Sequence, residues 1–428
     1  MTPAYAGGEL GRFPVRAISG DLPALPVTME KMDRRQFLQR TIYAAGACVG
    51  AKLVFAPNLV SAPGRTIYRR KTDPSKKINS IPRKQEVTFT EGRYYRPTGP
   101  HIQCTLCPIF CVIPEGEAGL CRVRVNRGRK LYTMVYGQPC SVAFHPMEQG
   151  PIFHALPGSQ CLGVATAGCN LRCKYCQNWQ MSQFSAEETD NYDLPPERVV
   201  RLAQEKRCEA VVFAYTEPII FYEYALDTAK VAKSEGLKTV LVTAGYVDTQ
   251  PLKDLCAFMD VIRIDLKSFS EEFYKDVVGG TLQPVLRAMK TVHEEGTWLE
   301  VVDPLVPGFN DSPEEIREMC EWMLENLGAD VPLHFLKFFP AYKMRNFPPT
   351  PEEVLSRSRQ IAMDVGLNYV YVGNMPGHEG ENTFCPNCGK RLIARVGYLG
   401  IAENNISNGK CRFCGHPIPG IWASSSVG

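Results

Sequence analysis

The sequence lacks a marked excess of charge of either sign. Its 428 residues include 48 Lys and Arg and 45 Asp and Glu, which leaves a formal net charge of +3. It also lacks a basic, aromatic-rich stripe, so we expect no nucleic-acid partner. Basic residues gather only locally, between Arg65 and Lys77. This pattern is typical of a solvated linker, and a contact with an anionic surface is the alternative.

Uninterrupted hydrophobic runs, internal repeats and low-complexity segments are missing as well. The mostly apolar stretch from Ile42 to Val60 is broken by two glycines, by Lys52 and by Pro57, so it makes a poor permanent membrane span. Hydrophobic residues make up 44% of the chain and charged residues 22%, which is ordinary for a globular protein. The length allows one catalytic domain of roughly 200–250 residues with smaller attachments.

The N-terminal region resembles an export signal. Arg34 and Arg35 precede Gln36-Phe37-Leu38, the apolar stretch follows, and Val60-Ser61-Ala62 is a small-residue cleavage site. This order is typical of a twin-arginine signal, and an ordinary amphipathic helix is the alternative. Met32 lies directly before the motif, so we interpret residues 1–31 as an overlong start.

Seventeen cysteines are present, and most fall into three groups. The first group is Cys104, Cys107, Cys111 and Cys121, the second is Cys169, Cys173 and Cys176, and the third is Cys385, Cys388, Cys411 and Cys414. A disulfide scaffold would suit a much shorter secreted chain. Tight clusters in an enzyme-sized chain indicate metal binding instead.

Short apolar runs alternate with helical patterns through the middle of the chain. The runs are Leu162–Thr166, Ala210–Tyr215, Thr239–Thr243, Val261–Leu266, Leu299–Val302, Leu333–Phe338 and Tyr369–Val372, and candidate helices lie near 195–207, 218–235, 249–258, 281–295, 312–327 and 351–365. Alternation of this kind predicts an α/β fold with a parallel sheet and right-handed crossovers. We expect a partial (β/α)6 TIM-like barrel, with the chemistry at the C-terminal ends of its strands.

The chain is therefore predicted to have five parts. They are a twin-arginine-type signal region at 1–62, a basic linker at 63–100, a Cys-rich segment at 101–155, a barrel at 156–375 and a CxxC/CxxC metal-binding, zinc-ribbon-like subdomain at 376–428.

The central cysteines follow the spacing C-x3-C-x2-C on a loop just after the first predicted barrel strand. A fully ligated 4Fe-4S cluster takes four cysteines, so Cys169, Cys173 and Cys176 would leave one iron open. An open iron can bind the amino and carboxylate groups of S-adenosylmethionine (SAM) and pass an electron to its sulfonium. A structural zinc site is the alternative, but zinc usually takes a fourth protein ligand, and none lies close in sequence.

This motif, with Tyr175 before its last cysteine, resembles the radical SAM signature. Further blocks resemble the radical SAM enzymes of the AmmeMemoRadiSam system, which are relatives of pyruvate formate-lyase activating enzyme. These blocks are Cys104–Pro108, Gly168–Leu171, Cys176–Trp179, Tyr215–Pro218, Asp265–Lys267, Pro307–Asp311 and Tyr371–Asn374. The resemblance covers about residues 101–422 and implies a radical SAM barrel that binds a 4Fe-4S cluster and SAM.

Several side chains in the central cysteine motif and on the later strands are candidates for binding SAM: Tyr175, Thr216, Glu217, Thr243, Asp265, Lys267 and His334. Glu217 suits an ammonium group, but it also fits a helix N-terminal acid. Asp265 and Lys267 alternate onto one strand face, where they could hold the methionine moiety or form a simple internal salt bridge. A lone His such as His334 in an apolar strand is often a core residue. Ala244 stands where relatives carry Asn, so that side-chain contact is lost.

The two flanking cysteine groups are expected to hold metal. Two C-x2-C knuckles with a spacer of 22 residues make a structural zinc ribbon the first interpretation at the C-terminus, with a rubredoxin-like iron or an auxiliary cluster as alternatives. The N-terminal group, C-x2-C-x3-C-x9-C, fits neither standard ferredoxin spacing. Either zinc or an auxiliary iron–sulfur cluster could occupy it, and a structural site is slightly favoured.

Taken together, these patterns predict a radical SAM enzyme that forms a 5′-deoxyadenosyl radical and abstracts hydrogen from an unidentified protein or small molecule. A glycyl-radical-enzyme activase is one alternative, and a metal-stapled, non-catalytic binding protein is another. We expect an electron donor such as reduced flavodoxin or ferredoxin, and Memo-like and AMMECR-like proteins as candidate partners. The export motif favours the periplasm or the outer membrane face, whereas the supply of SAM and low-potential electrons favours the cytoplasm.

Overall fold

The computed structural model describes residues 81–84 and 86–422. The predicted twin-arginine region at 1–62 and residues 63–80 and 85 of the predicted linker at 63–100 lie outside these residues. None of the helices in the described part is both long and apolar enough to cross a membrane.

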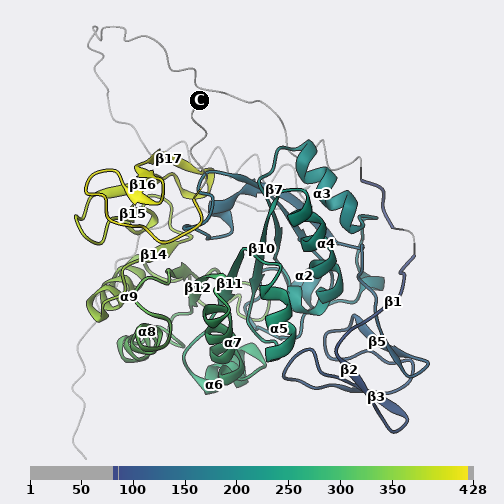
Figure 1. The fold of residues 1–428 in the computed structure, drawn as a ribbon. Helices are drawn as coiled ribbons and strands as arrows, with labels where there is room; N and C mark the ends of the chain where they lie inside the picture. The colour runs from purple at the N-terminus through teal and green to yellow at the C-terminus, as the bar shows by residue number, and fades with distance from the viewer. Residues whose placement is uncertain (1–80, 85, 423–428) are drawn as a thin grey trace, which may run out of the picture. The chain divides into compact units, whose positions relative to one another are not determined.

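An eight-stranded sheet forms the centre of the described part (Figure 1). Its strands are β7 (Ser141–Pro146), β8 (Gln160–Ala165), β9 (Ala210–Phe213), β10 (Lys238–Thr243), β11 (Val261–Asp265), β12 (Trp298–Leu305), β13 (Leu333–Lys337) and β14 (Val370–Gly373). They are neighbours in chain order; β7 pairs antiparallel with β8, and β8 to β14 are parallel. All seven predicted apolar runs overlap β8 to β14. The class is therefore α/β, as predicted.

Helices connect the parallel strands and follow one another along the sheet in chain order (Figure 1). They are α3 (Pro196–Glu205), α4 (Tyr222–Ser234), α5 (Thr249–Cys256), α7 (Leu282–Glu294), α8 (Pro313–Leu327) and α9 (Glu352–Val365), with short helices at α2 (Trp179–Ser182), η4 (Pro218–Phe221), α6 (Glu271–Phe273) and η5 (Tyr274–Val278). Right-handed crossovers between consecutive neighbours place such helices on one face of a sheet. Among the described strands β7 and β14 do not pair, so the sheet is open, and its assignment as a partial barrel stays a prediction.

Small antiparallel sheets precede the main sheet. One contains β1 (Thr90–Glu91), β6 (Lys130–Thr133) and β5 (Arg124–Arg127), and another contains β2 (Tyr95–Thr98), β3 (His101–Cys104) and β4 (Val112–Ile113). They occupy the end of the predicted linker and much of the predicted Cys-rich segment at 101–155. That segment also contributes β7 to the main sheet, through non-local pairing with β8.

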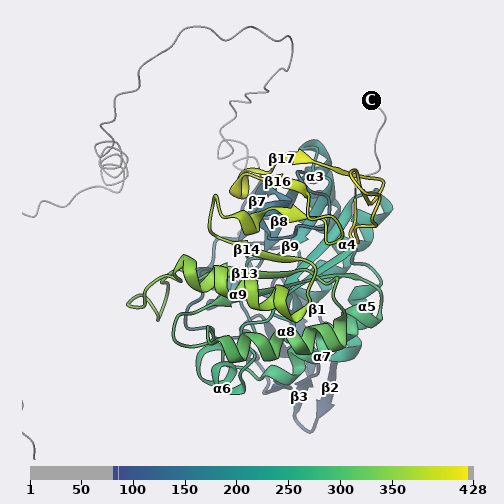
Figure 2. The ribbon, with the colours of Figure 1, turned by 90° about the vertical axis from the view of Figure 1, so that its left-hand side faces the viewer.

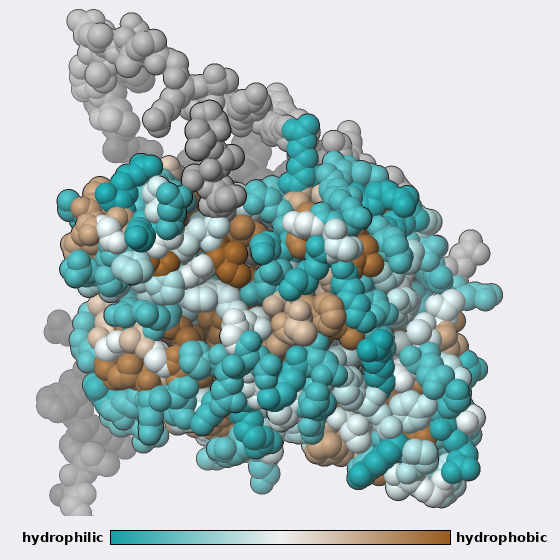
Figure 3. All heavy atoms as spheres, in the orientation of Figure 1, coloured by the Kyte–Doolittle hydropathy of each residue, from teal (hydrophilic) through white to brown (hydrophobic). Residues whose placement is uncertain are grey.

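The C-terminal subdomain follows β14. Its strands are β15 (Thr383–Phe384), β16 (Arg391–Arg395), β17 (Ile401–Asn404), β18 (Ile406–Ser407) and β19 (Lys410–Cys411). Figure 2 shows these strands beside the main sheet, and a bridge between Ala155 and Ile421 joins the subdomain to the β7–β8 connection. On the face in Figure 3, hydrophobic residues form small patches among hydrophilic ones.

Candidate active site and cysteine centres

The loop after β8 carries the three central cysteines and is tied to several elements. Arg172 N–H donates to the Val278 carbonyl at 2.8 Å, and Lys174 N–H donates to the Val277 carbonyl at 2.9 Å. The Asn170 side-chain amide donates to the Tyr246 carbonyl at 2.8 Å. These hydrogen bonds tie the loop to η5 and to the segment around Tyr246.

Burial shapes the chemistry of the three thiols. It raises the pKa of Cys173 to about 12 and raises the pKa of Cys169, where the Glu217 carboxylate adds to the effect. Iron ligation requires thiolates, so these two sulfurs would ionise only beside a compensating cation. The Leu171 N–H already donates to the Cys169 sulfur at 3.3 Å, which favours the thiolate form. Three cysteine sulfurs are the kind of donor that an iron–sulfur cluster takes.

A cavity of about 330 Å³ lies at the C-terminal ends of the parallel strands. This volume is within the range of small-molecule sites, about 300–1,000 Å³. Nine of the predicted site residues border it: Cys169, Cys173, Cys176, Tyr175, Thr216, Glu217, Thr243, Asp265 and Lys267. The structure therefore brings the three cysteines together with all the candidate SAM-binding residues except His334.

The Glu217 carboxylate is 2% exposed and accepts three hydrogen bonds. The donors are the Ile219 N–H at 3.1 Å, the Thr243 hydroxyl at 2.6 Å and the Ala244 N–H at 2.9 Å. Burial raises the pKa of Glu217 although these bonds oppose the shift. A carboxylate offers about four acceptor positions, so these three donors leave one unused. The expected helix N-terminal role is present, and it leaves room for an ammonium partner.

Asp265 is the last residue of β11 and Lys267 lies just beyond the strand. The two form an ion pair, with the Lys267 Nζ 2.8 Å from the Asp265 carboxylate. Arg263 also contacts Asp265 at 2.6 Å. Burial favours protonation of Asp265, but the two cations outweigh it and lower its pKa. The internal salt bridge considered from the sequence thus exists. Two cations, Arg263 and Lys267, contact the single carboxylate of Asp265, so the cations outnumber the acid in this group.

Further residues complete the cavity, and the sequence pattern did not single them out as site residues. Lys337 borders it, and no ion pair joins Lys337 to a carboxylate among the described residues. Its backbone carbonyl accepts a hydrogen bond from the Asn374 side chain at 3.1 Å. His145 reaches the cavity from β7. Lys337 could have been found from the sequence, because it lies on a strand that the pattern predicts. His145 could not, because its place at the cavity depends on the pairing of β7.

Tyr175 borders the cavity, but its hydroxyl is buried and not open to it. Its side chain is 8% exposed, and its hydroxyl is buried without a hydrogen-bond partner in the described structure. Its ring lies 6.2 Å from that of Phe273 and 6.1 Å from that of Phe338. A buried hydroxyl without a partner is costly unless a ligand or water satisfies it.

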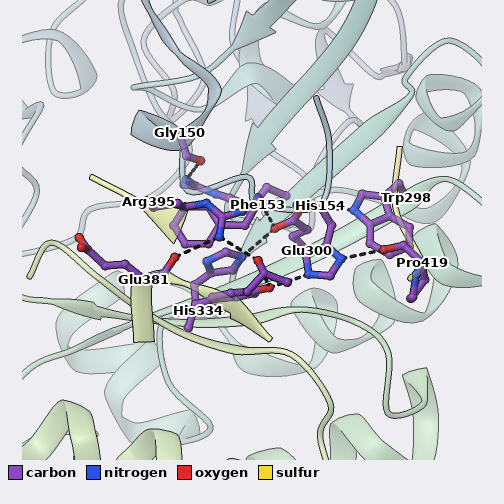
Figure 4. A network of polar contacts seen from close by, with 12 residues as sticks. Gly150, Phe153, His154, Trp298, Glu300, His334, Glu381, Arg395 and Pro419 are labelled. Carbon is purple, nitrogen blue, oxygen red and sulfur yellow. Dashed lines mark hydrogen bonds and ion pairs between the residues drawn. The ribbon is translucent and has the colours of Figure 1, made fainter. Parts of the chain in front are cut away.

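His334 lies elsewhere, in a buried polar network shown in Figure 4. Its Nε2 is 2.7 Å from the Glu300 carboxylate, and Glu300 also accepts the N–H groups of Phe153 and His154 at 2.9 Å each. Arg395 from the C-terminal subdomain lies 3.9 Å above the Phe153 ring. The structure does not bring His334 to the cavity; here it helps to join the subdomain to the sheet.

The C-terminal cysteines form a compact group. Their four sulfur atoms lie within 4.8 Å of one another. Cys385 and Cys414 have sulfurs 3.6 Å apart, and Cys388 and Cys411 have sulfurs 3.8 Å apart. A zinc–sulfur bond of about 2.3 Å gives tetrahedral edges of about 3.8 Å. The arrangement fits a single tetrahedral metal ion.

These features define an α/β protein in which cysteine sulfurs border a cavity at the edge of a parallel sheet. Residues 164–323 match the model of the radical SAM superfamily. An uncharacterised protein of Methanocaldococcus jannaschii is 41% identical over 318 residues, which are 74% of this chain and 95% of that protein. The chain belongs to the radical SAM superfamily and is a radical SAM enzyme, which removes the alternative of a non-catalytic binding protein.

Other similar proteins are activating enzymes. The pyruvate formate-lyase-activating enzyme of Clostridium pasteurianum is 27% identical over 195 residues, 44% of this chain and 76% of that enzyme. The pyruvate formate-lyase 1-activating enzyme of Escherichia coli K12 is 24% identical over 222 residues, 48% of this chain and 89% of that enzyme. A crystal structure of a domain of the Bacteroides vulgatus activating enzyme is 22% identical, with a TM-score of 0.35 over 39% of this chain and 99% of its own.

Proposed function

We propose that this enzyme holds a 4Fe-4S cluster on Cys169, Cys173 and Cys176 and abstracts hydrogen from a protein or small-molecule substrate. When bound, the cluster and SAM supply a reductive cleavage that gives methionine and a 5′-deoxyadenosyl radical. The supporting observation is the cavity that these three cysteines share with Glu217, Asp265 and Lys267. We also propose that the strands enclose it as a partial barrel.

The residues of the cavity have distinct roles in this proposal. Glu217 has a free acceptor position for the SAM amino group, and Lys267 and Lys337 supply cations for its carboxylate. Asp265 holds Lys267 in place. Burial keeps water from the reacting atoms.

We further propose that the enzyme belongs to an AmmeMemoRadiSam system, with Memo-like and AMMECR-like proteins as candidate partners and a reduced flavodoxin or ferredoxin as electron donor. The motif blocks and the flanking cysteine groups support this assignment. A glycyl-radical-enzyme activase is the second candidate, and the similarity to pyruvate formate-lyase-activating enzymes favours it.

Deuterium transfer separates the two candidates. Reconstituted enzyme would be incubated with SAM, a reductant and one deuterated protein: a Memo-like protein, an AMMECR-like protein or pyruvate formate-lyase. Deuterium in 5′-deoxyadenosine with one of the first two would identify that protein as the substrate and support the proposal. Deuterium transfer only from pyruvate formate-lyase, together with a glycyl radical signal, would instead establish the activase.

A further inference from the structure

A second sulfur-lined cavity lies next to the candidate active site. All four N-terminal cysteines, Cys104, Cys107, Cys111 and Cys121, border it. The rest of its lining is mainly apolar, and it includes Leu106 and Ile113, each 1% exposed. Four thiols converge on one enclosed space here, although their sequence spacing matched no standard site.

The spacing of these sulfurs differs from that of the C-terminal group. Among the described residues, only the C-terminal cysteines form a set of three or more ligand atoms within 4.8 Å of one another. The radical SAM cysteines, too, surround a cavity and are not gathered to this distance. In a cuboidal cluster each thiolate binds a different iron, so the sulfurs stay apart and enclose a volume. By this criterion the N-terminal group resembles the radical SAM cysteines and not a single-ion site.

Backbone N–H groups are directed at the N-terminal sulfurs. The Leu120 N–H donates to the Cys111 sulfur at 3.4 Å. The backbone at Ile109 and at Val123 lies close to the Cys107 and Cys121 thiols and favours their ionised forms. Hydrogen bonds of this kind stabilise ligating thiolates and tune the potential of iron–sulfur clusters.

The loop that carries the radical SAM cysteines also forms a wall of the second cavity. Asn170, next to Cys169, borders it. Gly168 has a φ of +89°, and a Cβ added there would lie 2.5 Å from the Cys121 carbonyl oxygen. The Arg172 guanidinium donates to the carbonyls of Cys169 and Leu120. One short segment thus holds the two sulfur groups against each other.

A buried ion pair anchors the second cavity to the main sheet. Arg124 borders the cavity and is 1% exposed, and its guanidinium contacts the Glu223 carboxylate of α4 at 2.8 and 2.9 Å. It also donates to the Arg93 carbonyl at 2.8 Å. The anchor fixes the position of the N-terminal cysteines relative to the sheet and adds a cation beside four anionic ligands.

We infer that Cys104, Cys107, Cys111 and Cys121 hold a second, cuboidal iron–sulfur cluster that relays electrons to the radical SAM cluster. A low-potential one-electron carrier protein loses one electron, the second cluster gains it, and the radical SAM cluster then receives it. No bond or proton moves in this step. The destination of the electron rests on the proposed function, whereas the existence of the second cluster does not.

Metal content of the full chain tests this inference. After anaerobic loading with iron, sulfide and zinc, the wild type should hold about eight iron atoms, four per cluster, and about one zinc ion. A variant with Cys169→Ala, Cys173→Ala and Cys176→Ala should keep about four iron atoms and a reduced-cluster resonance that does not respond to SAM. This variant leaves the N-terminal group intact, so a folding defect there cannot obscure the result.

The reciprocal variant carries Cys107→Ala and Cys111→Ala, with Cys208→Ala as a matched control outside all three groups. The reciprocal variant should lose about half of the iron but keep its zinc and its SAM-sensitive resonance; the control should lose neither. The inference would be overturned if the variant without the radical SAM cysteines contained no iron and bound a second zinc ion. SAM cleavage by a wild type with about four iron atoms would then leave the proposed function standing.

Discussion

Replacing Glu217 with Gln tests whether this carboxylate binds SAM or only caps the short helix that follows. Gln keeps an oxygen that can accept from the Ile219 N–H and the Thr243 hydroxyl. Its amide nitrogen, however, would face the Ala244 N–H, which donates to the carboxylate at 2.9 Å. The substitution therefore removes the negative charge and one hydrogen bond while it preserves the shape of the side chain.

The expected magnitude follows from the loss of one charge-assisted hydrogen bond to the SAM ammonium. Such bonds contribute about 1.5–3 kcal/mol, which corresponds to a rise in the SAM Kd of roughly 10- to 150-fold. If Glu217 were only a cap, the loss would appear as roughly 0.5–2 kcal/mol of stability, without an effect on Kd.

Anaerobic calorimetry of SAM binding to the reconstituted enzyme, combined with thermal unfolding, distinguishes the two roles. Ser312→Ala is the matched control, because the Ser312 hydroxyl accepts from the Glu315 N–H at 3.2 Å and caps α8 outside the cavity. The control should lose stability and keep its Kd. A Kd for Glu217→Gln within twofold of the wild type would refute a contact between Glu217 and SAM.

Three other outcomes follow from the structure. Glu223→Gln leaves the buried Arg124 without a charged partner and should lower the free energy of unfolding by about 3–5 kcal/mol. Glu295→Gln, which breaks an exposed ion pair, is the control and should lower it by less than about 1 kcal/mol. Equal losses for the two variants in denaturant titrations would contradict this prediction. Burial lowers the pKa of His154 to about 4, so the unfolded chain binds the extra proton between pH 6.5 and 4. Stability should fall by about 3 kcal/mol as the pH drops through this window, and His154→Gln should flatten that slope. We also predict that residues 32–70 direct export of a reporter that only the twin-arginine route accepts. Retention of the reporter in the cytoplasm would contradict this prediction.

The main sheet could be predicted because its signal is local. Parallel strands covered by helices are buried on both faces, so they appear as continuous apolar runs. The ends of such strands share one edge, which is why residues as distant in sequence as Thr216 and Lys267 were expected near the cysteine loop. Arg263 could have been found in the same way, since it lies two residues before Asp265 on the same strand face.

Other features depend on pairing that the sequence does not show. Glu300 and His334 meet because the register sets Val302 beside His334 on neighbouring strands. Arg124 and Glu223 are 99 residues apart and share no local pattern. The convergence of the N-terminal cysteines likewise depends on how small antiparallel sheets pack against the cysteine loop. Non-local contacts of this kind determine which residues surround each site. The local sequence pattern identifies only the candidate ligand residues.

Reductive cleavage of SAM is the most direct measurement of the central claim. The wild type, loaded anaerobically with iron and sulfide and reduced with dithionite, should convert SAM into 5′-deoxyadenosine and methionine. Cys173→Ala should form neither product above background, while the metal content of its C-terminal cysteine group stays unchanged. Absence of 5′-deoxyadenosine from a fully loaded, reduced wild type would contradict the assignment of Cys169, Cys173 and Cys176 as the ligands of a radical-forming cluster.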